Sequence, residues 1–374
     1  MAVFSIVLLV LAVVVVVATA LSLSRAPYWW VRMCDFPRAQ IAALGVLVLV
    51  GYAAVVLGTP DTSTLEWVVL AALVVAVLYQ VRRMAPYTPL ARTQVVDADV
   101  VAEGRTLRLL VSNVLMENRE GDLWLETVRA ADPDVVIAVE TDAWWAETAG
   151  ALTDTLPHAI ELPQDDTYGM CVYSRFPFSQ SEVRHLVEKE VPSLFLTADL
   201  PGGDAVRLVF LHPRPPRPDI GQDSTLRDAE LVLAAREVAT YDGPVIVAGD
   251  LNDVAWSYTT SLFQKVAGLL DPRIGRGLFA TFHADRWWLR YPLDHVFHSD
   301  DLALVGLERL RNVGSDHFPI LIELAVDPSR RPIQEAPDAD ASDTDQAEEM
   351  VEDAAEFKAE ESADEKAERV AEDV

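Results

Sequence analysis

The sequence predicts an α/β protein: a four-layer α/β sandwich of two packed mixed sheets with outer helices, preceded by transmembrane helices. The first eighty or so residues are nearly all apolar. From Thr106 onwards, short apolar runs typical of buried strands alternate with segments of helical period. Several of the predicted strands follow one another without a helix between them, which favours two packed sheets over one doubly wound sheet.

Three apolar runs predict a membrane domain over residues 1–82, with transmembrane helices at about 3–23, 39–57 and 65–80. A run of about 20 apolar residues is long enough to span a bilayer. A cleaved signal peptide is the alternative interpretation of the first run. No Lys or Arg precedes that run and two further apolar runs follow it, so we expect an integral membrane protein.

The distribution of arginines predicts an orientation for these helices. Arginines follow the first and third runs but not the second: Arg25, Arg32 and Arg38 lie in the first loop, none lies in residues 58–64, and Arg82, Arg83 and Arg92 follow the third run. By the positive-inside rule the N-terminus is outside, and everything after Arg82 is inside. We therefore expect a protein of the inner or plasma membrane with its soluble domain in the cytoplasm.

The remaining chain divides into three predicted parts. Residues 83–103 contain Pro86 and Pro89 without a strong period, which indicates a linker. Residues 104–326 have the composition of a globular domain. Residues 327–374 are rich in Pro, Ala and acidic side chains, which predicts a disordered acidic tail.

Charge and cysteine content exclude some classes of protein. From residue 335 to the end there are 17 acidic and three basic side chains, a net −14 that is half of the total −28. The rest of the chain is also acidic, which argues against tight electrostatic binding of nucleic acid across the whole surface. The two cysteines, Cys34 and Cys171, form neither a disulfide framework nor a zinc pattern.

One stretch, residues 245–252, combines a buried strand with two polar side chains. Four apolar residues precede Gly249, where the backbone can turn, and Asp250 and Asn252 follow. Because they are two residues apart, their side chains point the same way on extended backbone. Other predicted strands also end in such residues: Asn113, Glu140, His212, and Asp294 with His295. Asp316 with His317 lies between a Gly-Ser turn and the apolar run that begins at Phe318. We expect them to meet at one edge of the sheets.

These residue types restrict the chemistry. Carboxylates with an amide suit a hard cation such as Mg²⁺ or Mn²⁺. A histidine beside a carboxylate suits phosphate binding or acid–base work. The sequence contains no nucleophile elbow and no glycine-rich phosphate loop. The pattern indicates metal-assisted hydrolysis of a phosphate ester with water as the nucleophile.

The motifs in this order resemble the endonuclease/exonuclease/phosphatase (DNase I-like) superfamily over about residues 106–324. They are Ser112-Asn113, Val139-Glu140, Gly249-Asp-Leu-Asn252, Leu293-Asp294-His295 and Gly314-Ser-Asp-His317. The apolar N-terminal segment, together with His212-Pro-Arg-Pro-Pro216, looks like a bacterial membrane-anchored member of that group.

The resemblance implies a metal site for Mg²⁺ or Mn²⁺. Glu140 should be the principal metal ligand, with Asn113 and Asp316 close to the ion or its waters. Leu115 stands where abasic-site endonucleases of the superfamily place a carboxylate, so a second metal position is in doubt.

The resemblance also implies catalytic roles. Asp250 should orient or deprotonate the attacking water, and Asn252 should hold a phosphoryl oxygen. His317 should contact the scissile phosphate, with Asp294 fixing its ring. His212 matches the second histidine of the DNase I-like and sphingomyelinase-like branches.

We therefore expect a membrane-anchored, divalent-metal-dependent phosphoester hydrolase, either nuclease-like or phospholipase-like. Its expected partners are the lipid bilayer and a phosphate ester, with nucleic acid, a phospholipid headgroup and a soluble phosphoester all open. The alternative is a membrane-tethered, non-catalytic binding protein that retains the fold.

Overall fold

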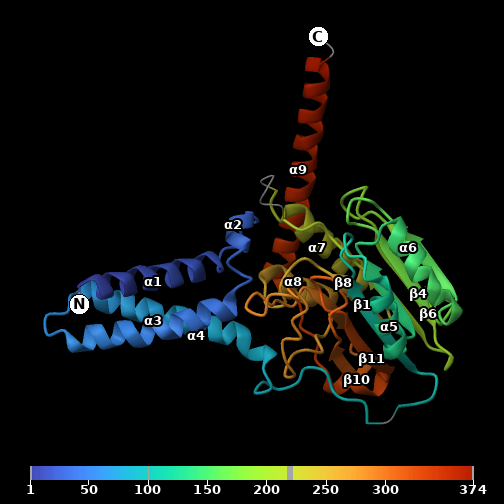
Figure 1. Cartoon of the computed structure of the whole chain (residues 1–374), viewed down its shortest axis with the longest axis horizontal. Coiled ribbons are helices and arrows are strands. Elements are labelled where there is room, and N and C mark those ends of the chain that lie inside the picture. The colour runs from blue at the N-terminus through green and yellow to red at the C-terminus, as the bar shows by residue number, and fades with distance from the viewer. Residues whose placement is uncertain (1, 100, 217–221, 373–374) are drawn as a thin grey trace. The chain divides into compact units, whose positions relative to one another are not determined.

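The computed structural model describes residues 2–99, 101–216 and 222–372, and the chain divides into two compact units (Figure 1). The first comprises Met1–Arg92 with two short segments from later in the chain. The second contains the rest and carries the sheets. Part of the predicted linker belongs to this second unit, because Val95 is buried in its core and the backbone of Val96 and Ala98 bonds to Leu304.

Three helices of the first unit are long and apolar enough to cross a membrane: α1 (Ala2–Leu21), α3 (Arg38–Gly58) and α4 (Thr64–Met84). The prediction of three apolar helices is confirmed. Helix α4 begins with a capping box, in which Ser63 accepts from the backbone N–H of Glu66 and Glu66 accepts from that of Ser63.

Two mixed sheets form the second unit. The first has the order β10-β11-β1-β2-β4-β3 and the second the order β5-β6-β7-β8-β9. The strands of the first sheet are β10 (Leu302–Arg309), β11 (Ile320–Val326), β1 (Thr106–Asn113), β2 (Val135–Val139), β4 (Met170–Ser174) and β3 (His158–Leu162). Those of the second are β5 (Phe178–Arg184), β6 (Ser193–Asp199), β7 (Ala205–Phe210), β8 (Val245–Asp250) and β9 (Asp294–His298).

The sheets pack face to face around one apolar core, with helices on their outer faces. Side chains of both sheets, such as Val111 and Ile246, form the central cluster. Helices α5 (Gly121–Ala131) and α6 (Ala143–Ala149) cover the first sheet. Helices α7 (Thr225–Ala239) and α8 (Tyr258–Ala267) cover the second. The predicted four-layer sandwich is confirmed.

Strand direction brings the predicted polar residues to one edge. Strands β1 and β2 are parallel, as are β7 and β8, so their carboxyl ends point the same way within each sheet. Strand β11 is antiparallel to β1, and β9 is antiparallel to β8, so both begin at that edge. In this register Asn113 pairs with Val139, and Asp250 pairs with Asp294.

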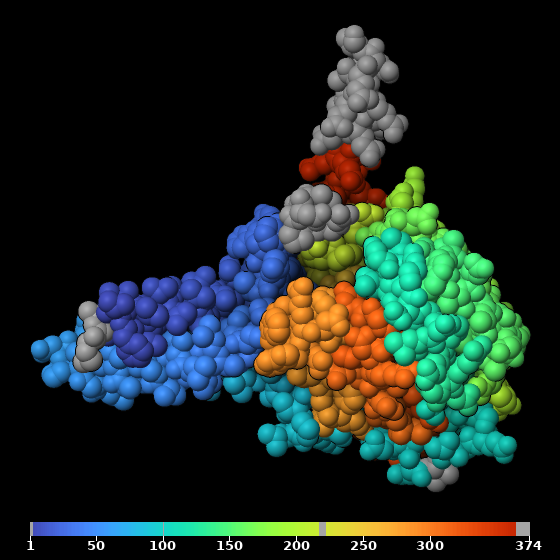
Figure 2. Space-filling view, in the orientation of Figure 1, coloured from blue at the N-terminus to red at the C-terminus, as the bar shows by residue number. Residues whose placement is uncertain are grey.

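The acidic C-terminal segment differs from the predicted disordered tail. It forms helix α9 (Ala341–Glu372), whose first half packs on α7 and α8 (Figures 1 and 2). Ala347 and Met350 pack with Val232 and Leu262, and Ala354 packs on α7 one turn further along. The physical reason is an apolar stripe spaced by three and four residues, which composition alone conceals beneath the acidic side chains.

Candidate active site

Asn113 and Glu140 lie in the candidate site at the ends of two neighbouring parallel strands, β1 and β2. Asn113 is the last residue of β1 and is buried, while Glu140 follows β2 and is partly exposed. The Nδ2 of Asn113 donates to Oε1 of Glu140 (2.7 Å) and to Oδ2 of Asp250 (3.0 Å). Its Oδ1 instead accepts from the backbone N–H of Leu115 (3.0 Å). The amide therefore joins two carboxylates that belong to different sheets.

A first group of possible metal ligands consists of Glu140, His212 and Asp250. One ligand atom from each lies within 4.8 Å of the other two. His212 follows β7 and is 2% exposed, yet its Nδ1 has no hydrogen-bond partner among the described residues. Burial raises the pKa of Glu140, as the adjacent Asp250 carboxylate also does, while His212 and Asn113 act in the opposite direction. Two carboxylates so close together disfavour each other's ionised form, which a nearby cation or protonation offsets.

A second group, Asp250, Asp294 and His317, shares Asp250 with the first. The Nδ1 of His317 lies 2.7 Å from Oδ2 of Asp294, and its Nε2 lies 3.6 Å from Oδ2 of Asp250. Burial alone lowers the pKa of His317, but the carboxylates of Asp294 and Asp250 outweigh it and raise that pKa to about 10. The imidazole is therefore a cation at neutral pH.

Asn252 lies beside Asp250 in an uncommon backbone conformation. Its φ is +52°, its N–H donates to Oδ1 of Asp250 (2.9 Å), and its Nδ2 donates to the carbonyl of Pro213 (3.0 Å). Glu140 has a similar φ of +61°. Left-handed backbone is rare for residues other than glycine and often marks functional sites, where the surrounding structure holds it in place.

Gly249 is required by a close approach between strands. Its φ is +143°, and a Cβ at this position would lie 1.9 Å from the carbonyl oxygen of Leu211. The glycine therefore allows β8 to lie against the chain that leads to His212, which brings Asp250 next to that histidine.

Asp316 lies at the margin of the site. It is partly exposed, and neither ligand group includes it. Its backbone carbonyl accepts from Ala284 (2.7 Å), and burial raises the pKa of its carboxyl, whereas the neighbouring His317 and His283 lower it. The structure thus brings six of the other seven predicted site residues around Asp250 and leaves Asp316 beside them. His295, which is next to Asp294 in the sequence, lies outside both ligand groups. Its Nε2 is hydrogen-bonded to the backbone carbonyl of Asp253 (2.8 Å).

Several supporting residues were absent from the predicted site. Ser315 accepts from the N–H of His317 (3.0 Å) and donates to the carbonyl of Asn113 (2.8 Å). Thr281 accepts from the N–H of Asp294 (3.2 Å). The ring of Tyr168 lies 5.9 Å from that of His212. Ser315 could have been chosen from its motif, but the contacts of Thr281 and Tyr168 connect distant parts of the chain and follow no sequence pattern.

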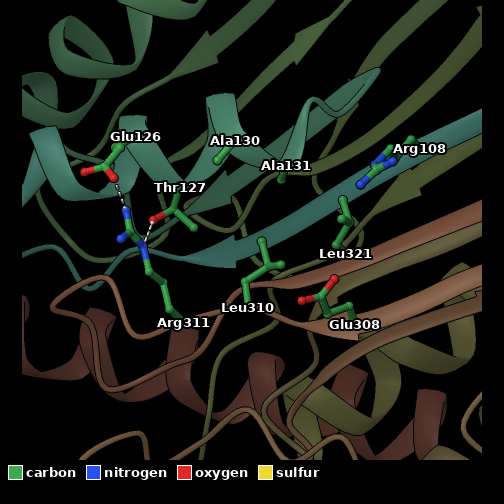
Figure 3. Close-up of a pocket in the computed structure, with 9 residues that line it drawn as sticks. All are labelled: Arg108, Glu126, Thr127, Ala130, Ala131, Glu308, Leu310, Arg311 and Leu321. Atoms are coloured by element: carbon green, nitrogen blue, oxygen red, sulfur yellow. Dashed lines mark hydrogen bonds and ion pairs between the residues drawn. The ribbon is translucent and has the colours of Figure 1, made fainter.

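A surface pocket on the first sheet contains none of the candidate site residues (Figure 3). Its volume is about 400 Å³, and it lies between α5 and strands β10 and β11. Arg311 crosses it, with Nε donating to Thr127 (2.7 Å) and a further nitrogen 3.1 Å from Glu126. The pocket walls are ordinary ion pairs and aliphatic side chains, so the polar strand ends, rather than this pocket, form the candidate site.

The fold and site define a class: a four-layer α/β sandwich with carboxylates, amides and histidines gathered where strands of both sheets end. The chain belongs to the endonuclease/exonuclease/phosphatase family, whose model matches residues 110–317. Members of this family generally hydrolyse phosphoester bonds. The resemblance of the sequence motifs to this family is thereby confirmed.

Several known proteins are similar to this chain at low sequence identity. The chain is 26% identical over 231 residues to a UPF0294 protein of Yersinia pseudotuberculosis, covering 58% of this chain and 83% of that protein. A solved endonuclease/exonuclease/phosphatase from Beutenbergia cavernae is 20% identical with a TM-score of 0.47, covering 60% of this chain and 72% of the other. The human nocturnin catalytic domain with bound sulfate is 17% identical with a TM-score of 0.49, covering 60% and 96%.

Proposed function

We propose that the protein is a membrane-anchored, divalent-metal-dependent phosphoester hydrolase that uses water as its nucleophile. The observation that carries the proposal is the position of the Asp250 carboxylate, which belongs to both ligand groups. One of its oxygens lies within 4.8 Å of a ligand atom of Glu140 and of His212, and Oδ2 lies 3.6 Å from Nε2 of His317.

The residues present fit a divalent cation. Glu140 is the principal ligand in this proposal, and His212 and Asp250 complete the group that could hold the same ion. Asn113, which donates to Glu140, and Asp316, at the margin of the site, are assigned to the surroundings of the ion and its waters. The buried, unpartnered Nδ1 of His212 supports a ligand here, and the carboxylates suit Mg²⁺ or Mn²⁺. The metal would polarise the phosphoryl oxygens and offset their growing charge.

The protonation of His317 suggests how the protein side chains divide the work. A histidine that is cationic at neutral pH cannot act as a base, so we assign to it the stabilisation of negative charge on the phosphate. Asp250 then accepts the proton of the attacking water. One N–H of the Asn252 amide donates to Pro213, and we assign the other to a phosphoryl oxygen.

Membrane anchoring would hold this site near a bilayer. Three helices with the length and composition of membrane spans support an integral protein of the inner or plasma membrane. The arginines after the first and third helices support a catalytic domain in the cytoplasm. The substrate class stays open between nucleic acid, a phospholipid headgroup and a soluble phosphoester. The anchor favours a lipid, and the acidic surface disfavours duplex nucleic acid.

The alternative, a binding protein without catalysis, predicts that one or more site residues would have been lost or turned away. Instead, buried polar contacts connect Asn113, Glu140, Asp250, Asp294 and His317. Such an arrangement of buried charge is costly to maintain without a ligand.

The test uses the full chain in detergent or nanodiscs with Mg²⁺ or Mn²⁺. Turnover of bis-p-nitrophenyl phosphate should exceed that of an Asp250→Ala, His317→Ala double variant; equal rates would refute catalysis. Single-stranded DNA, RNA, sphingomyelin and inositol phosphates compared side by side would then identify the substrate class.

A second readout tests the metal site without activity. Glu140→Gln should weaken Mn²⁺ binding in calorimetry by at least the roughly 10–100-fold that even an outer-shell partner costs. Glu126→Gln is the matched control, since Glu126 is exposed on α5. Equal Mn²⁺ affinity of wild type and Glu140→Gln would refute the assigned ligand.

A further inference from the structure

Helix α7 carries buried ionisable side chains that the proposed chemistry does not use. Arg227 and Glu230 are each 1% exposed and Asp228 is 2% exposed. The helix packs on the second sheet and is also in contact with α8 and α9. A buried cation destabilises a fold unless it is paired and hydrogen-bonded, so the partners of Arg227 indicate its role.

The guanidinium of Arg227 connects α7 to the loop that follows Asp250. Its Nε and Nη2 donate to Oδ1 of Asp228 (2.9 and 2.7 Å), and Nη2 also lies 3.5 Å from Oδ2 of Asp253. Its Nη1 donates to the backbone carbonyl of Asn252 (2.8 Å). One planar group thus contacts two carboxylates and the backbone of a candidate site residue.

The loop itself is held from several directions. Asp253 accepts from the N–H of Val254 (2.9 Å) and from the hydroxyl of Ser257 (2.6 Å), and its carbonyl bonds to His295. Asn252, which has a positive φ, donates its N–H to the carboxylate of Asp250. Arg227 contacts the carbonyl of that same residue, so the peptide that follows Asn252 cannot rotate without breaking this bond.

We propose that Arg227 is a positioning residue, which holds the Asn252 backbone in its left-handed conformation and thereby aims the Asn252 amide and the Asp250 carboxylate at the substrate. The inference rests on the proposed function and deepens it. The shape of the guanidinium is as important as its charge for this role. Arginine presents its N–H donors as a rigid planar fork, which lets one group contact three partners in different directions. Lysine cannot reach Asn252, Asp228 and Asp253 together from one ammonium.

The test compares Arg227→Lys and Arg227→Met with Glu230→Gln in the full chain at pH 7. Glu230 is equally buried one turn along α7, where it accepts from Ser193 on β6 (3.0 Å). Amide hydrogen exchange of residues 249–257 and the kinetic constants are measured for each variant. We expect kcat to fall by about 10–100-fold in both Arg227 variants, as for outer-shell partners of a metal site, with KM nearly unchanged.

Exchange of residues 249–257 should rise in the Arg227 variants and stay at the wild-type level in Glu230→Gln. Wild-type kcat and exchange in folded Arg227→Met would overturn the proposal, and so would an equal loss in Glu230→Gln, which would indicate general loosening of α7. If Arg227→Met does not fold, the double variant with Asp228→Asn leaves less unpaired buried charge and gives the same readouts. If wild type hydrolyses no substrate, the proposed function fails, while exchange of this segment still tests Arg227.

Discussion

The Nδ1 of His317 lies 2.7 Å from Oδ2 of Asp294, with both side chains buried. The two residues come from different places, since Asp294 begins β9 of one sheet and His317 precedes β11 of the other. The contact therefore joins the sheets at the edge where the site lies. It also fixes which ring nitrogen of His317 faces Asp250.

Replacing Asp294 with Asn should lower the pKa of His317, because Asp294 is the strongest influence that raises it towards 10. A lower pKa means that the cationic form is lost at a lower pH. We expect the alkaline limb of the pH–rate profile to move to lower pH, and kcat at neutral pH to fall by up to roughly 10²–10³-fold, the range for losing one group that stabilises negative charge in the transition state.

The measurement is kcat between pH 6 and about 10. Asp122→Asn, an exposed change on α5, is the control and should leave the profile unchanged. An alkaline limb in Asp294→Asn that coincides with that of wild type would contradict the role given to this pair.

The fold could be predicted because buried strands leave apolar runs in the sequence, and the site because several of those runs are flanked by a polar residue. The two sheets bring the strand ends together, so Asn113, Glu140 and Asp250 were identifiable without coordinates. Arg227 and Thr281 were not, because their contacts follow no local period. The packing of α9 was missed since Met350 and Ala354 lie among acidic side chains that dominate its composition.

Met350→Ala should destabilise the catalytic unit, because Met350 packs with Val232 and Leu262 between α9, α7 and α8. We expect the free energy of unfolding to fall by about 2 kcal/mol, the low end of the range for a buried Met→Ala change, because this cluster is peripheral. That corresponds to a fall in Tm of roughly 4–8 °C for a domain of this size.

Thermal unfolding of the full chain measures this effect, with the exposed neighbour Glu348→Ala as the control. Ending the chain at Gln334 should lower Tm further, because it uncovers Leu226 and Ala229 as well. An unchanged Tm after that truncation would show that α9 is not part of the folded unit in solution.

Glu230 should make stability fall with rising pH. Burial raises its pKa from 4.5 to about 8. Between these two values the folded state holds a proton that the unfolded chain has released, so the free energy of unfolding decreases by about 1.4 kcal/mol for each pH unit. The contribution is fully favourable to folding only below pH 4.5.

Glu230→Gln keeps a neutral side chain of similar shape and removes this titration. Urea unfolding at pH 5 and pH 8 should show the variant gaining a few kcal/mol relative to wild type at the higher pH. Glu126→Gln should show no such gain, because Glu126 is exposed. A constant difference between Glu230→Gln and wild type across this range would mean that Glu230 is ionised in the folded state.

We predict the orientation in the membrane from arginines at one end of the helices. The loop between α1 and α3 carries Arg25 and Arg32, and Arg82 and Arg83 end α4, whereas residues 59–63 between α3 and α4 contain no cation. An alkaline phosphatase reporter fused after Asp61 should be active, because that loop is expected outside. A green fluorescent protein fused after Val374 should fluoresce, because the catalytic unit is expected inside. The reverse pattern at both fusion points would place the candidate site outside the cytoplasm, and its substrate would then have to be sought among extracytoplasmic phosphoesters.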